Sequence, residues 1–122
     1  MKLRFDHQSL RLRVKKSDIE RLSKDGFIEE NVHFPQGILV YRLETTLHTD
    51  ALSAEINAHN ITVLIPADKA AEWINSENVG IYGSLPTTVE KKMLEILIEK
   101  DFPCKHGSTA DNADSFEELS KL

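Results

Sequence analysis

Four basic residues of the sequence have the types and the spacing of an anion-binding site. Arg11, Arg13 and Lys15 alternate with apolar residues along one stretch, and Arg42 stands in a second stretch of the same alternating kind. On a β-strand, alternate side chains share one face at intervals of about 6–7 Å. Guanidinium and ammonium groups at such intervals bind phosphate oxygens through charge-assisted hydrogen bonds. One interpretation is therefore a site for a small anion or a phosphate ester, formed by Arg11, Arg13, Lys15 and Arg42.

The other interpretation of these cations is a solvated sheet face on which they pair with acids of neighbouring strands. The acids available for such pairs stand in stretches that are themselves predicted strands: Glu44, Glu55, Glu95 and Glu99. Opposite charges that face each other across a sheet stabilise it. We favour this paired face and keep the anion site as the alternative.

Residue patterns for metal binding or catalysis are weak in this sequence. Cys104 and His106 have the spacing of a ligand pair, but a zinc site takes four protein ligands, or three and a water. The sequence contains no glycine-rich phosphate loop, no HExxH motif and no Ser-His-Asp pattern. We therefore predict no metal, no cofactor and no catalytic residue, and we interpret Cys104 as a small buried or half-buried thiol.

The basic stretch belongs to a predicted strand that leads directly into a helix. Apolar and basic residues alternate over Ser9–Lys15, which is the period of a half-buried strand. Ser17 with Glu20 three residues later has the pattern of a capping box and predicts a helix over Asp18–Lys24. Gly26 then supplies the left-handed residue that ends the helix.

The other predicted elements follow from alternation, β-branched runs and turn residues. The strands are Lys2–Phe5, Phe27–Phe34, Ile38–Thr46, Leu52–Asn57, Ile61–Ile65, Val79–Leu85 and Lys91–Lys100. Lys2–Phe5 forms with the basic strand either a hairpin or one strand broken by a bulge at Asp6–Gln8. Ile61–Ile65 is the predicted central strand. Pro66 opens a second helix over Ala67–Asn75.

These elements predict an α+β fold. Short turns favour antiparallel pairing, so we expect a curved, mostly antiparallel sheet or a small barrel of about seven strands, with two short helices at connections. Residues 1–104 form a single compact domain in this interpretation, and residues 105–122 form a polar tail, with a short docking helix over Ser115–Lys121 as one alternative. The residues predicted to be buried are Leu10, Leu12, Val14, Tyr41, Leu43, Ile61, Val63, Ile65, Trp73 and Ile96.

Composition and charge limit the partners. The 122 residues carry a net charge of −5, but residues 1–24 hold eight Lys or Arg against three acids. Because the chain as a whole is acidic, we do not expect nucleic acid as a partner. A single cysteine indicates a reducing compartment, and no apolar run has the length of a signal peptide or a membrane span, so we expect a cytoplasmic protein.

Several segments together resemble a known family. They are SLRLRVKKSDIERL, VHFPQGILVYRLE, ITVLIPADKAAEWINSENVGIYG and LEILIEKDFPC. The chain resembles, over about residues 1–104, a family of small, mainly bacterial proteins classed as a domain of unknown function. The resemblance implies a single compact domain and implies no activity, cofactor or catalytic residue.

The sequence therefore predicts a small non-enzymatic binding or interaction module, whose partner is a protein or a small anion. The alternative is a protein or enzyme that binds a small anion or a phosphate ester through the basic strand. Unpaired strand edges allow a monomer or a dimer.

Overall fold

The part of the chain that the computed structural model describes, residues 1–101 and Phe116, forms two four-stranded sheets and two helices. The elements are β1 (Lys2–Asp6), β2 (Ser9–Val14), α1 (Lys16–Asp25), β3 (Phe27–Phe34), β4 (Gly37–Thr46), β5 (Ser53–Asn57), β6 (Asn60–Pro66), α2 (Ala67–Ile74), β7 (Gly80–Pro86) and β8 (Met93–Lys100). Sheet A has the strand order β1-β2-β8-β7, and sheet B has the order β3-β4-β6-β5.

Each sheet consists of two hairpins joined along a parallel pair of strands. The hairpins are antiparallel, whereas β2 pairs with β8, and β4 with β6, in parallel. The predicted α+β class and the predominance of antiparallel pairs are confirmed. The single sheet of about seven strands is wrong, because α1 carries the chain from β2 to β3 in a second sheet. Neither sheet closes on itself, so the small barrel is not confirmed.

The two halves of the described chain repeat one element order, strand–strand–helix–strand–strand. Exchanging β1–β4 with β5–β8 converts the strand order of sheet A into that of sheet B, so the two halves have equivalent topologies. The first turn of each half also has the same form, with φ of 55° at His7 and 53° at Ala58. The amino-acid sequence by itself shows no such repeat.

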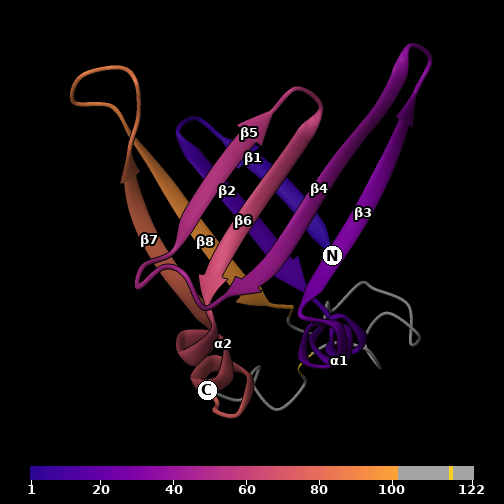
Figure 1. Cartoon of the computed structure of the whole chain (residues 1–122), viewed down its shortest axis with the longest axis vertical. Coiled ribbons are helices and arrows are strands. Elements are labelled where there is room, and N and C mark those ends of the chain that lie inside the picture. Colours follow the sequence, from indigo (N-terminus) through magenta and orange to yellow (C-terminus); the bar gives the residue numbers. More distant parts are fainter. Residues whose placement is uncertain (102–115, 117–122) are drawn as a thin grey trace.

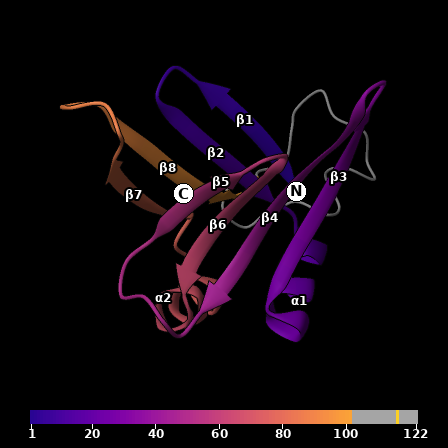
Figure 2. The same cartoon turned by 45° about the horizontal axis from the view of Figure 1, so that its top comes forward.

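The inner faces of both sheets pack into one hydrophobic core. Of the ten residues predicted to be buried, nine are buried and Tyr41 is half-buried. Trp73 of α2 is 1% exposed, and its indole N–H donates to the backbone oxygen of Val79 at 3.1 Å. Both helices lie at one end of the sheets, which diverge toward the hairpin tips at the other end (Figures 1 and 2).

Helix α1 begins two residues earlier than predicted. Lys15 is the N-cap, and its backbone N–H donates to Oδ2 of Asp18 at 2.9 Å, so Asp18 takes the role assigned to Glu20 in the predicted capping box. The predicted pattern is wrong because β2 ends at Val14 and the backbone turns into the helix at once. The predicted stop is confirmed, since Gly26 has φ of 82° and donates to the backbone oxygen of Leu22.

Several sequence predictions fall on the C-terminal residues. Cys104, His106 and the alternative helix over Ser115–Lys121 lie outside the described residues, except for Phe116. Phe116 is 7% exposed, and its N–H donates to the backbone oxygen of Asp101 at 2.7 Å. The domain boundary near residue 104 stays a prediction. No helix in the described part of the chain has the length and apolar character needed to cross a membrane.

Candidate functional site

Strands β1 and β2 present four cations together on the outer face of sheet A. In the β1–β2 ladder, Lys2 lies opposite Arg13 and Arg4 lies opposite Arg11. Residues directly opposite in an antiparallel pair share a face, with their Cβ atoms about 4.5–5.5 Å apart. The alternating residues Leu3 and Leu12 lie opposite each other on the inner face. We call the set of Lys2, Arg4, Arg11 and Arg13 the basic face.

The acids near the basic face compensate only part of its charge. Nε of Arg11 lies 3.0 Å from Oε1 of Glu99, and Nζ of Lys2 lies 3.8 Å from Oδ2 of Asp101. Arg4 and Arg13 are exposed and make no ion pair with any residue of the described chain. Like charges directly opposite each other are destabilising, so the basic face carries an electrostatic cost that its neighbours do not remove.

The equivalent topology of the two halves provides an internal comparison for the basic face. Hairpin β5–β6 occupies in sheet B the place of β1–β2 in sheet A, with the same register. The positions that correspond to Lys2, Arg4, Arg11 and Arg13 are occupied by Ser53, Glu55, Thr62 and Leu64. Because one half of the fold forms this hairpin without any of the cations, the fold does not require them.

The structure divides the predicted anion site. Arg11 and Arg13 are neighbours on β2, whereas Lys15 follows the end of that strand and caps α1. Arg42 lies on β4 of sheet B, where its guanidinium pairs with Glu44 at 2.6 Å and lies 3.8 Å from the centre of the Phe27 ring. Arg42 therefore does not join the cations of β2.

The expected pairing with acids is also only partly present. Of the four predicted partners, Glu99 alone pairs with a cation of the basic face within residues 1–101. Glu44 pairs with Arg42, and Glu95 accepts a hydrogen bond from the Ser84 hydroxyl at 2.9 Å. Glu55 lies on β5 of the other sheet. The pairing of β2 with β8 determines which glutamates lie near the cations of β2. Turn lengths in the sequence do not predict this parallel pair.

The surface over the basic face is hollowed. Lys2, Leu3, Arg4, Arg11 and Arg13 line a depression of ≈ 420 Å³. A second shallow groove of ≈ 580 Å³ adjoins it over β2, β8 and β7, with Arg11, Glu95 and Tyr82 in its lining. Burial and the hydrogen bond that the Tyr82 hydroxyl donates to Glu99 raise the pKa of this tyrosine, so it stays a neutral donor at neutral pH.

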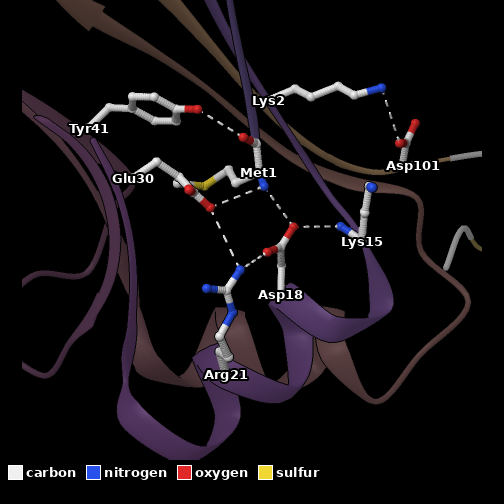
Figure 3. Close-up of polar contacts among 8 residues, drawn as sticks. All are labelled: Met1, Lys2, Lys15, Asp18, Arg21, Glu30, Tyr41 and Asp101. Carbon is white, nitrogen blue, oxygen red and sulfur yellow. Dashed lines mark hydrogen bonds and ion pairs between the residues drawn. The ribbon is translucent and has the colours of Figure 1, made fainter. Parts of the chain in front are cut away.

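A second polar cluster joins the start of the chain to α1 and sheet B (Figure 3). Oδ2 of Asp18, a residue only 1% exposed, lies 3.0 Å from the ammonium of Met1. Oδ1 of the same carboxylate accepts from Arg21. Glu30 lies 3.4 Å from the Met1 ammonium, and the Tyr41 hydroxyl donates to the Met1 backbone oxygen at 2.9 Å.

This cluster is a structural anchor. Burial by itself raises the pKa of Asp18, but the Lys15 N–H, the Met1 ammonium and Arg21 together outweigh burial and hold the pKa of Asp18 below its usual value. Both carboxylate oxygens have partners, so Asp18 is ionised and has no free oxygen to accept a proton from a substrate. Burial, followed by the negative charges of Glu30 and Asp18, raises the pKa of Tyr41.

Comparison with known proteins assigns the family. The model of the Family of unknown function (DUF7009) matches residues 1–120. The chain belongs to this family. The predicted resemblance to a family of unknown function is thereby confirmed. No curated protein and no solved structure matches the chain.

The DUF7009 fold adds two residues to the site that the sequence predicted. Lys2 and Arg4 belong to the basic face, and their signal in the sequence is the alternation with Leu3 and Phe5 before a short turn. A two-residue hairpin turn fixes the register and so places them opposite Arg13 and Arg11. In the described part of the chain, no group of three or more His, Cys, Asp or Glu side chains has the arrangement of a metal site.

Proposed function

We propose that this DUF7009 protein is a non-enzymatic binding module that binds an acidic protein partner through the basic face. The observation that carries the proposal is two pairs of like-charged residues at alternate rungs of one hairpin, Lys2 opposite Arg13 and Arg4 opposite Arg11. The equivalent hairpin of the second half folds with Ser53, Glu55, Thr62 and Leu64 at these positions. Cations that a fold does not need and that repel one another are typical of a surface used in binding.

The electrostatics favour this role over a purely structural one. Exposed ion pairs contribute little to stability, typically about 0.2–1 kcal/mol. A complementary acidic partner replaces repulsion by attraction and also accelerates association.

A small anion is the second candidate ligand. The depression of ≈ 420 Å³ between Lys2, Leu3, Arg4, Arg11 and Arg13 supports it, because two guanidinium groups can hold one phosphate through several hydrogen bonds. An enzyme acting on a phosphate ester at this surface needs a general acid or base as well. The two carboxylates that pair with cations of the basic face are already engaged, Glu99 by Arg11 and the Tyr82 hydroxyl, and Asp101 by Lys2.

A ligand screen tests the proposed function. A ligand that binds only the native state raises its melting temperature. We expect polyglutamate to stabilise the protein at low ionic strength, and inorganic phosphate at matched ionic strength to have a smaller effect. The variant Arg4→Ala/Arg13→Ala should lose this stabilisation, whereas Lys69→Ala/Lys91→Ala, which removes two exposed cations on α2 and before β8, should keep it. A melting temperature unmoved by any anion contradicts the proposal.

Substitution of single arginines separates cations that repel from cations that pair. We expect Arg13→Ala to leave the free energy of unfolding level or slightly higher, because it removes a like-charge contact with Lys2. Arg11→Ala removes the pair with Glu99 together with the like-charge contact with Arg4, so it should lower the free energy of unfolding by at most about 0.2–1 kcal/mol. Urea melts of both variants at low ionic strength measure the difference. If Arg13→Ala lowers the free energy of unfolding more than Arg11→Ala does, the assignment of repelling and pairing arginines is wrong.

The setting in the cell is part of the same proposal. A single cysteine in 122 residues supports a reducing, cytoplasmic location, and the family resemblance supports a bacterial source. The oligomeric state, a monomer or a dimer, stays a prediction.

A further inference from the structure

We infer that the acidic partner binds as an added β-strand along the free edge of β1. The inference rests on the proposed function and specifies the form of the ligand: an extended segment in which acidic and apolar residues alternate. Three observations at this edge support it.

The first observation is that β1 ends sheet A. Among the described residues, β1 pairs with β2 on one side and with no strand on the other. An edge strand offers its unpaired N–H and C=O groups to a further strand. Proteins that bind extended peptides in this way obtain affinity from main-chain hydrogen bonds and specificity from alternate side chains.

The second observation is the charge on the outer side of this edge. Lys2 and Arg4 point to the outer face of β1, and both are exposed. A strand added beside β1 places alternate residues directly opposite them, where acidic side chains gain attraction. Arg11 and Arg13, one strand further in, extend the positive field across the sheet.

The third observation is apolar surface on the inner side of the same edge. Phe5 lies on the inner face of β1 and is 57% exposed. On sheet B, Glu30 and Tyr41 contact Met1 beside the start of β1 (Figure 3). Phe5 also lines an apolar hollow of ≈ 180 Å³ together with residues of β2, β5, β6 and β8.

These observations together define the ligand. A fifth strand of sheet A would lie with its apolar residues beside Phe5 on the inner side, and with its acidic residues beside Lys2 and Arg4 on the outer side. A folded acidic surface or a free anion interacts only with the positive charge of the basic face. An alternating acidic and apolar strand uses the charge, the main-chain groups and the apolar surface at once.

Peptide titrations test the inference. The probe is a labelled synthetic peptide in which Glu and Val alternate over about six residues, the length of an ordinary strand. Its controls are a peptide of the same composition with the Glu and Val residues in separate blocks, and the alternating peptide with N-methylated backbone amides. We expect the alternating peptide to bind about tenfold more tightly than either control. For the N-methylated peptide this corresponds to about two lost main-chain hydrogen bonds, and for the block peptide it reflects acidic residues placed on the apolar side of the strand.

Protein variants locate the binding edge. Arg4→Glu and Phe5→Ser change exposed side chains of β1, and both should weaken the alternating peptide several-fold while leaving the thermal melt cooperative. Lys24→Glu, an equal charge change on exposed α1, should not affect binding. If the three peptides and polyglutamate bind alike and Phe5→Ser has no effect, strand addition is refuted and the proposed function stands. If neither the peptides nor polyglutamate bind, both are refuted.

Discussion

Val63→Asp is expected to abolish folding. Val63 is 1% exposed and lies on β6, paired with Leu43 on one side and Ala54 on the other. An ionised carboxylate at this position lies among the apolar side chains of the core, and the effective penalty for burying an unpaired charge is several kcal/mol. Domains of this kind are stable by only about 5–15 kcal/mol. We expect no cooperative transition in a urea melt at neutral pH.

Thr62→Asp provides the matched control. Thr62 precedes Val63 on the same strand and points to the outer face of sheet B, in register with Arg42. On its other side Thr62 lies opposite the exposed Glu55 of β5. The same new carboxylate therefore meets water, a guanidinium and one exposed acid, so the free energy of unfolding should stay within about 1 kcal/mol of that of the parent protein. If Val63→Asp melts like the parent, the assignment of β6 as a buried central strand is wrong.

The elements of this fold were predictable because each has a local signal. The alternation of Leu10, Leu12 and Val14 gave β2, and their burial in the structure is complete. Gly26 gave the end of α1, where φ of 82° requires a residue without a Cβ penalty. The Ile-rich alternation before Lys100 gave β8 in preference to a helix.

The division into two sheets was not predictable from local signals. Pairing of β2 with β8 joins residues more than eighty positions apart, and nothing in either strand specifies its distant partner. The prediction of one sheet followed from short turns, which correctly give the hairpins but do not say how hairpins assemble. The repeat of the two halves was hidden for the same reason, since it resides in strand order and register.

The candidate site was predictable to the extent that it is local. Arg11 and Arg13 follow from the alternation of β2 itself. To place Lys2 and Arg4 beside them, the register of the β1–β2 hairpin had to be known. To exclude Arg42 from the site, the division into two sheets had to be known. The anchor at Asp18 had one local signal, the i,i+3 spacing of Asp18 and Arg21 on α1. Its other members, Met1 and Glu30, come from two separate segments and could not be assigned from spacing.

Asp18→Asn is expected to cost about 3–5 kcal/mol of unfolding free energy at neutral pH, the range for breaking a buried ion pair by removing one partner. The substitution leaves the Met1 ammonium facing an amide, with Glu30 at 3.4 Å as its remaining acid. Arg21 and the Lys15 N–H lose their charged acceptor as well. Glu20→Gln is the control, because Glu20 is an exposed carboxylate of the same helix.

The pH dependence of the stability difference tests whether it arises from the ionised carboxylate of Asp18. Its pKa in the folded protein lies below the unfolded value, which is about 3.9 for aspartate. The unfolded chain therefore takes up the proton first as the pH falls, and stability decreases with it. The contribution of Asp18 is complete above about pH 4 and is lost as the pH falls through its folded pKa. Urea melts at neutral pH and near pH 3 should show the gap between parent and Asp18→Asn narrowing in acid, and a gap that is constant with pH would exclude the ion pair as its origin.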